Sequence, residues 1–281
     1  MMVKPFILNI LKPDFWLRLL LCAGLTAITY RGAAQKLTLV QSVPVDGPGV
    51  ISLDRLSNIY VTDRKNNLYK LDPAGKTLQT YSPPRSGHVA SVEAWSMVKT
   101  LLFYDDQQQI TLLDRFLTPI TTARLADFTN GIIKAATLAA DDRIWLLNES
   151  DISLHKIDIR YPDAGQETQL NQILPRSQSD IRFMREYQNN LYILDRLSGV
   201  YVFDNMGNYK KKLPLPGLSY IGFKGEELYF VKDNKLNFYN LYTLQTRAVN
   251  LPAAKAYEQV LIGENFYYLF SAGGLDIYAR Q

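Results

Sequence analysis

Residues 61–76, with the sequence VTDRKNNLYKLDPAGK, align without a gap on residues 193–208, with the sequence ILDRLSGVYVFDNMGN. Each copy has the pattern of a strand, a tight turn, a second strand and then an Asp-x-x-Gly turn. Repetition of such a unit indicates an array of small sheets, because one unit alone cannot bury its own hydrophobic face. The repeat therefore carries much information about architecture and little about chemistry.

Six such units can be traced after Gln35. Each contains a marker strand that is rich in aromatic and β-branched residues and follows a polar turn. The markers begin at residues 58, 100, 143, 190, 227 and 265, with spacings of 42, 43, 47, 37 and 38 residues. A four-stranded propeller blade needs about 40 residues. The sequence therefore predicts an all-β fold, a six-bladed β-propeller over residues 35–281.

The sixth unit offers only three strands, the last of them at Leu275 to Tyr278. A separate β segment, Leu37 to Val43, stands before the first unit. We predict that this N-terminal strand completes the last blade and closes the ring, which would remove the free edges of an open array.

The N-terminus has the features of a signal peptide over residues 1–34. Three basic residues precede an apolar run from Leu19 to Ile28, and Gly32-Ala33-Ala34 offers small residues for cleavage before Gln35. The run has about ten residues, whereas a stable membrane span needs roughly 20, so we expect no stable span after signal removal. A retained anchor and lipidation of Cys22 are the alternatives.

Removal of the first 34 residues changes what the composition implies. These residues carry four basic side chains and one acidic side chain, so the mature chain keeps 27 basic and 26 acidic residues. A nearly neutral chain gives no support to nucleic-acid binding. If Ala34 ends the signal, the single cysteine, Cys22, leaves with it, which would exclude disulfides, a thiol nucleophile and thiolate metal sites.

The first and fourth units resemble a known repeat family. Asn58-Ile59-Tyr60-Val61-Thr62-Asp63, followed by Asp72-Pro73-Ala74-Gly75-Lys76, resembles the NHL-type repeat of six-bladed propellers. Residues 190–207 are similar to exported, TolB-like propellers of Bacteroidetes-type bacteria. The resemblance implies the fold. It leaves the function open, because propellers of this superfamily include lactone hydrolases, peptide-binding modules and uncharacterised exported proteins.

Polar residues end the second strand of each unit and are expected to gather on one face of the ring. They are Asp63, Asp105, Asn148, Asp195, Asp233 and Ser271. Such a ring could hold a cation or a basic peptide. The competing interpretation is that Asp and Asn side chains shape tight turns by accepting backbone hydrogen bonds, and Arg64 and Arg196 would partly cancel the charge.

A second polar set opens the next turn of each unit and should lie on the opposite face. It comprises Asp72, Asp114, Asp158, Asp204 and Asn240. Type I turn chemistry explains this set, because Gly75 and Gly207 follow three residues after Asp72 and Asp204.

Aromatic and basic residues are expected around the axial entrance of the propeller. They are His88, Lys134, Arg182, Tyr220 and Tyr257. Exposed Tyr and Arg are common anchors in binding surfaces, although both tyrosines could instead pack between neighbouring blades. The other histidine, His155, has apolar neighbours and is interpreted as structural.

Catalytic signals are weak. The resemblance to metal-dependent lactonases implies acidic and amide ligands around the channel, and Glu93, Asp180, Glu186 and Glu258 lie near predicted inner strands without matching that arrangement. No Gly-x-Ser-x-Gly motif and no Walker loop is present. The sequence therefore assigns no catalytic residue, no metal ligand and no cofactor.

These observations predict an exported, non-catalytic binding or scaffolding propeller in the periplasm, on the outer membrane or outside the cell, monomeric by itself. Its partner would be a protein or peptide of the cell envelope. The predicted binding residues are Asp63, Arg64, His88, Asp105, Arg182, Asp195, Arg196, Tyr220 and Tyr257. The alternatives are a divalent-metal-dependent hydrolase of the gluconolactonase type and a purely structural part of an envelope complex.

Overall fold

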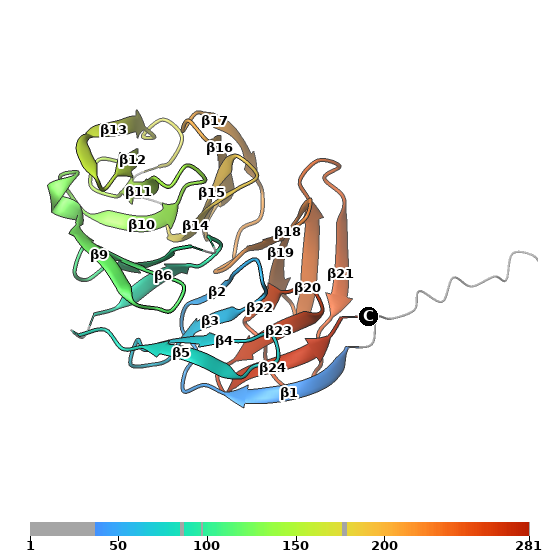
Figure 1. Cartoon of the computed structure of the whole chain (residues 1–281). Helices are drawn as coiled ribbons and strands as arrows, with labels where there is room; N and C mark the ends of the chain where they lie inside the picture. The colour runs from blue at the N-terminus through green and yellow to red at the C-terminus, as the bar shows by residue number, and fades with distance from the viewer. Residues whose placement is uncertain (1–36, 85–86, 97, 176–178, 281) are drawn as a thin grey trace, which may run out of the picture. The chain divides into compact units, whose positions relative to one another are not determined.

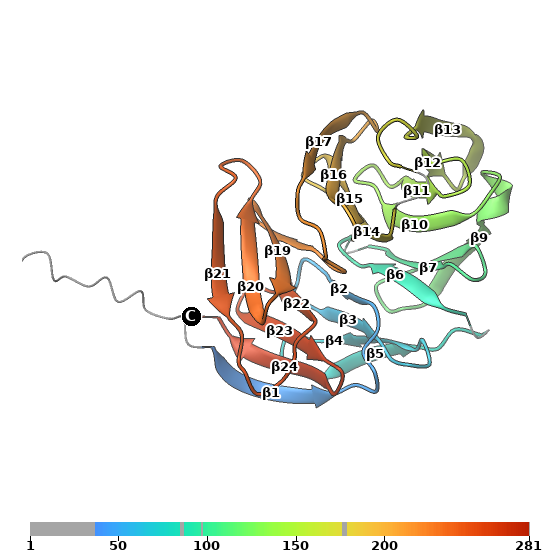
Figure 2. The ribbon, with the colours of Figure 1, turned by 180° about the vertical axis from the view of Figure 1, so that it is seen from behind.

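The structure of the protein is a computed structural model, which describes residues 37–84, 87–96, 98–175 and 179–280. The predicted signal peptide and Cys22 lie outside these residues. The described chain forms six four-stranded antiparallel sheets, shown from two sides in Figures 1 and 2. Its only helical element is a single 3-10 turn, η1 (Leu125–Asp127). No helix in the described part has the length and apolar character needed to cross a membrane. The prediction of a six-bladed β-propeller is confirmed.

The first three blades follow one another along the chain, each with its strands in sequence order from the axis outward. Blade 1 contains β2 (Ile51–Leu53), β3 (Ile59–Thr62), β4 (Leu68–Leu71) and β5 (Thr77–Tyr81). Blade 2 contains β6 (Val89–Glu93), β7 (Thr100–Tyr104), β8 (Gln109–Leu113) and β9 (Pro119–Arg124). Blade 3 contains β10 (Ile133–Leu138), β11 (Ile144–Asn148), β12 (Ser153–Asp158) and β13 (Tyr161–Gln169).

The remaining blades repeat this order until the last strand. Blade 4 contains β14 (Ile181–Tyr187), β15 (Asn190–Asp195), β16 (Gly199–Asp204) and β17 (Tyr209–Leu213). Blade 5 contains β18 (Gly222–Lys224), β19 (Glu227–Lys232), β20 (Lys235–Asn240) and β21 (Thr246–Asn250). Blade 6 contains β22 (Gln259–Ile262), β23 (Phe266–Ser271), β24 (Gly274–Ala279) and, as its outer strand, β1 (Thr38–Pro44).

The N-terminal strand closes blade 6, as the sequence predicted. β1 pairs antiparallel with β24, with Leu39 opposite Tyr278 and Val43 opposite Leu275. The Ser42 hydroxyl donates to Asp276 Oδ1 at 2.5 Å. This pairing joins the first and last strands of the described chain and gives the ring no open blade.

Asp276 is the polar centre of this closure. It is 2% exposed. Besides the bond from Ser42, it accepts hydrogen bonds from Lys255 Nζ at 2.6 Å and from the Tyr257 hydroxyl at 2.8 Å. Burial acts to raise the pKa of Asp276, but these donors outweigh it and hold the pKa below its ordinary value. The carboxylate therefore favours closure in its charged form.

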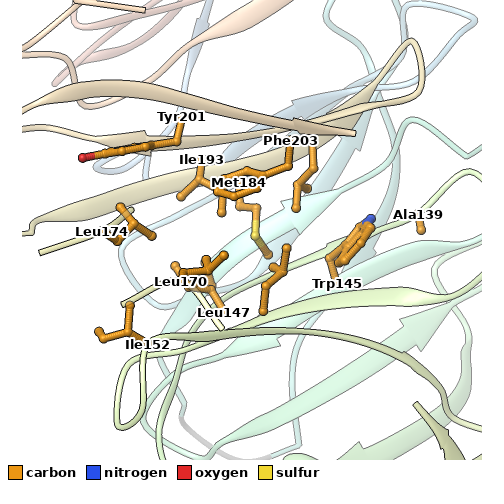
Figure 3. Packing of buried hydrophobic residues seen from close by; sticks show 13 residues of the cluster. Ala139, Trp145, Leu147, Ile152, Leu170, Leu174, Met184, Ile193, Tyr201 and Phe203 are labelled. Atoms are coloured by element: carbon orange, nitrogen blue, oxygen red, sulfur yellow. The ribbon is translucent and has the colours of Figure 1, made fainter. Parts of the chain in front are cut away.

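The hydrophobic core consists of six clusters, one between each pair of neighbouring blades. Figure 3 shows the cluster between blades 3 and 4, where Trp145 and Leu147 of β11 face Met184 of β14 and Phe203 of β16. Each blade thus buries both faces against its neighbours, which is the arrangement that a repeat of small sheets requires.

Aspartate-centred turns explain why the quoted repeat is visible in the sequence. Asp63 Oδ1 accepts backbone N–H bonds from Lys65 and Asn67, two and four residues later. The turns at Asp54, Asp72, Asp114 and Asp204 have the same pattern. The residue three after each aspartate has a positive φ, 90° at Gly75 and 84° at Gly207, and glycine adopts this conformation without a steric penalty.

Candidate functional site

The inner strands enclose an axial cavity of about 240 Å³. Its walls come from β2, β6, β10, β14, the segment before β18, and the start of β22, so every blade contributes. Small side chains such as Ser91, Ala135 and Ala136 leave this space where six strands converge. The cavity is thus a product of the ring and not of any single blade.

A buried ion pair lies at the inner end of this cavity. Arg185 Nε and Glu93 Oε2 are 2.7 Å apart, and the two residues are 7% and 5% exposed. Ser52 accepts a 3.3 Å hydrogen bond from Arg185 Nη2, and Thr137 donates to Glu93 at 3.4 Å. Burial acts to lower the pKa of Arg185, but the neighbouring Glu93 carboxylate raises it. This cluster joins the inner strands of blades 1, 2, 3 and 4.

Glu93 also borders a second cavity, of about 580 Å³, at the other ends of the inner strands. Trp95 and Tyr187 line that cavity with their rings 6.1 Å apart and edge to face. The Arg55 guanidinium lies 5.5 Å from the centre of the Trp95 ring. The Glu93–Arg185 pair therefore lies between two cavities that open at different ends of the axis.

The mouth of the axial cavity carries an excess of positive charge. Lys134 and Arg182 both line it. Arg182 binds Asp180, with Nε 2.7 Å from Oδ1, and Arg196 binds the same carboxylate at 2.6 Å. Burial acts to raise the pKa of Asp180, but the two guanidinium groups outweigh burial and hold the pKa below its ordinary value. Two arginines share one carboxylate, and Lys134 forms no ion pair within the described residues.

Tyr220 adds a hydrogen-bonding group to the cavity wall. Its ring packs edge to face on Phe183, with the ring centres 5.1 Å apart. Its hydroxyl is buried and has no hydrogen-bond partner within the described residues. Burial raises the pKa of Tyr220 and outweighs the nearby Arg185 guanidinium, which acts to lower it, so the hydroxyl stays protonated.

The structure separates the predicted binding residues into accessible and internal groups. Arg182 and Tyr220 line the axial cavity, and Arg196 contacts Arg182's partner Asp180 without lining the cavity. Asp195 is fully buried. It accepts backbone hydrogen bonds from Asp180 and Leu197. It therefore shapes the turn after β15 and is not placed to touch a ligand, which corrects the expectation for this residue.

Tyr257 is also internal. It is 5% exposed, packs between blades 5 and 6 and donates to Asp276. Its position corrects the expectation of an exposed ring at the axial entrance. The alternative that the sequence offered, packing between neighbouring blades, describes what it does.

Three further predicted residues lie on the same face but outside the cavity wall. His88 Nδ1 is 2.7 Å from Asp105 Oδ1, and both side chains are exposed. Arg64 lies 3.7 Å from Asp46, in an exposed ion pair. Neither pair lines the axial cavity. These pairs belong to the rim of the face and can contact only a partner larger than the cavity.

Asp63 also lies on this rim, and its contacts are those of a turn residue. Burial acts to raise its pKa, but hydrogen bonds from Asn67, Lys65 and Tyr69 lower it. We expect Asp63→Ala to lower the free energy of unfolding by about 1–2 kcal/mol at pH 7, because several hydrogen bonds to a charged acceptor are lost.

The sign of the pH dependence tests this assignment. A depressed native pKa stabilises the fold above the unfolded value of about 3.9, and this stabilisation is lost as the pH falls through the native pKa. Urea unfolding of the wild type and of Asp63→Ala should therefore show a difference in the free energy of unfolding that is constant near pH 7 and shrinks below about pH 4. A difference that is independent of pH would contradict the charged-turn assignment.

Three of the four acidic residues that could have formed a lactonase-type centre are engaged by other side chains. Glu93 is bound to Arg185, and Asp180 to two arginines. Glu186 accepts a 2.6 Å hydrogen bond from the Trp145 indole. Glu258 borders an adjoining cavity that shares Tyr220 and Gln259 with the axial cavity. Arg185 itself was not singled out from the sequence. Its only sequence signal is a charge within a predicted inner strand.

No protein-family model matches the sequence, and no curated protein matches it. Several solved structures are similar to this chain. Virginiamycin B lyase from Staphylococcus aureus, in a catalytically inactive variant with quinupristin, has a TM-score of 0.60 and 13% identity, over 88% of this chain and 100% of the lyase chain. BamB from Moraxella catarrhalis has a TM-score of 0.53 and 12% identity, over 88% and 98%.

A third similar structure is the extracellular domain of BT4673 from B. thetaiotaomicron. It has a TM-score of 0.53 and 12% identity, over 81% of this chain and 33% of that one. At these identities the similarity establishes the propeller fold alone. The fold is shared by a lyase and by proteins that are not described as enzymes, so the site must carry the functional argument.

Proposed function

We propose that this propeller is a non-catalytic binding module, which receives an acidic group of a protein or peptide partner at the mouth of the axial cavity. The observation that carries the proposal is the combination of Lys134, which has no ion pair within the described residues, with Arg182 at the wall of a small cavity. A cationic concave site favours anionic ligands and speeds their association.

The size of the cavity supports a macromolecular partner. Pockets for drug-sized ligands usually measure about 300–1,000 Å³, and this cavity measures about 240 Å³. A single side chain or a terminal carboxylate fits such a volume better than a complete small-molecule substrate does. The rest of the partner would then lie over the rim that carries the His88–Asp105 and Arg64–Asp46 pairs.

We further propose that the protein acts in the cell envelope and is monomeric by itself. The predicted signal peptide over residues 1–34 supports export, and so does the similarity to an extracellular domain. The near neutrality of the mature chain supports a protein or peptide partner in preference to a nucleic acid.

The hydrolase of the gluconolactonase type is the less favoured alternative. Such an enzyme needs oxygen ligands for a divalent cation near the axis. Here Glu93 is paired with Arg185, whose positive charge would repel a cation at that carboxylate. The ion pair therefore favours the binding module over the hydrolase.

The test compares capture of envelope proteins by three versions of the full chain. One is the wild type, and one carries Lys134→Ala with Arg182→Ala. The matched control carries Lys76→Ala with Arg143→Ala. Lys76 is exposed in the turn just before β5, and Arg143 binds Asp141 two residues before it, as Arg182 binds Asp180.

We expect one envelope protein to be recovered by the wild type and by the control, and at least tenfold less by the axial variant. Tenfold corresponds to about 1.4 kcal/mol, a modest loss for two anchoring charges. Equal recovery by all three versions contradicts the proposal. Metal-dependent lactone hydrolysis that the axial substitutions abolish would support the hydrolase instead.

A further inference from the structure

A second polar cluster lies on blade 3 and shares no residue with the axial cavity. Asp151 belongs to the turn between β11 and β12, His155 to β12 and Glu167 to β13. One ligand atom from each residue lies within 4.8 Å of the other two. His155 and Glu167 are direct partners across the β12–β13 pair. The backbone register therefore fixes two members of the cluster.

Neighbouring hydroxyl groups hold the His155 ring in place. The residue is 9% exposed, and its Nε2 lies 2.7 Å from Ser153 Oγ and 3.4 Å from Thr129 Oγ1. Ser153 Oγ donates its hydrogen to Asp151 Oδ1 at 2.5 Å. Because that hydrogen is used, Ser153 accepts from Nε2–H when the ring is neutral, so a metal would bind Nδ1 or, after the hydrogen moves to Nδ1, Nε2. Hydrogen bonds that orient an imidazole in this way are typical around metal ligands.

The charge of the cluster is unbalanced. Neither Asp151 nor Glu167 forms a salt bridge with any described residue. Two other carboxylates of the same blade do have such partners, since Asp158 binds Arg160 and Asp141 binds Arg143, whereas the exposed Glu149 has none within the described residues. Among the described residues, Glu167 receives only one side-chain hydrogen bond, a 2.7 Å bond from Gln169. A bound cation would neutralise two carboxylates that otherwise repel each other.

The cluster also has space for a hydrated ion. Asp151, His155 and Glu167 line an open cavity of about 370 Å³. Both carboxylates are exposed, so rotation of their side chains can shorten the separations to those of a common ion, with bonds of about 2.0–2.2 Å. One imidazole nitrogen with two carboxylates, and water in an open position, is a ligand set that suits Zn²⁺ and similar divalent metals.

We propose that Asp151, His155 and Glu167 bind a divalent transition-metal ion of the Zn²⁺ class. The ion joins the turn after β11 to β12 and β13, which are the two outer strands of blade 3. It is independent of the axial cavity, so the proposed function of that cavity can fail while this site stands.

Histidine ring NMR gives a direct test, because the chain contains only two histidines, His88 and His155. The full chain, purified without a histidine tag, is titrated with ZnCl₂. We expect one equivalent of Zn²⁺ to shift the ring signals of His155, identified by comparison with His88→Ala, which should keep the site. The His88 signals should remain unchanged up to one equivalent.

Two acidic substitutions provide the matched comparison. Glu167→Gln should weaken Zn²⁺ binding at least tenfold in calorimetry and remove the stabilisation by Zn²⁺ in a thermal melt. Glu226→Gln changes another exposed glutamate, in the β18–β19 turn of blade 5, and should change neither the Zn²⁺ affinity nor the stabilisation by Zn²⁺. The proposal is overturned if Zn²⁺ shifts only His88, if no shift occurs, or if Glu167→Gln binds Zn²⁺ as tightly as the wild type.

Discussion

Replacing Arg185 with methionine is expected to lower the free energy of unfolding by about 3–5 kcal/mol, which is the usual cost of breaking a buried ion pair. Glu93 would remain 5% exposed without a counter-charge. Its remaining polar contacts are a 3.0 Å bond from the Trp95 amide and a 3.4 Å bond from Thr137, and these are too weak to replace a guanidinium. Urea unfolding followed by circular dichroism measures the loss.

The double variant Glu93→Gln with Arg185→Met should recover much of this loss, because it leaves no buried charge. A double-mutant cycle then gives the coupling between the two side chains. Arg247→Met is the matched control. Arg247 binds Glu227 through two hydrogen bonds, but half of the Arg247 side chain is exposed, so its loss should cost no more than about 1 kcal/mol. Equal losses of unfolding free energy in Arg185→Met and Arg247→Met would contradict the conclusion that Glu93 and Arg185 form a buried ion pair.

Deletion of residues 37–44 is expected to abolish the cooperative unfolding transition. Without β1, the polar backbone groups along the edge of β24 lose their partners and become available to other chains. Asp276 also loses the bond from Ser42, and Val43 leaves the cluster between blades 6 and 1. Size-exclusion chromatography should show aggregates, and thermal melts should show no sharp transition.

The control for this deletion keeps the strand and changes its exposed surface. Leu39 and Val40 are 52% and 55% exposed, so threonine at both positions should preserve folding. A synthetic peptide of residues 37–45 should restore a cooperative transition to the deleted protein if the missing edge is the cause. A deleted protein that melts like the wild type would show that the closure contributes little to stability.

The sequence predicted the parts of this fold that depend on local chemistry. The turn at Asp63 and the one at Asp204 each use a carboxylate that bonds to backbone two and four residues later, so their signature fits within one short segment. The pairing of β1 with β24 was predictable for another reason. Closure requires a fourth strand for blade 6, and only one unassigned β segment was present.

The charged residues of the interior could not be predicted in the same way. Glu93 and Arg185 are 92 positions apart and meet only because their inner strands face one axis. Asp195 aligns with Asp63 in the repeat, yet Asp195 is fully buried and Asp63 is not. Likewise, the sequence shows only apolar neighbours around His155, whereas the register of β12 and β13 places Glu167 opposite it. Such relations depend on spatial placement and leave no fixed spacing in the sequence.

The position of β1 has a consequence for biosynthesis. Ser42 and its partner Asp276 are 234 positions apart. At translation rates of about 5–20 residues per second, the synthesis of β24 follows that of β1 after an interval on the order of 10–50 s. During elongation the nascent chain therefore carries β1 without its partner strand. Chaperones that recognise extended segments have a long interval in which to hold residues 38–44, and the last blade can close only after β24 has been synthesised.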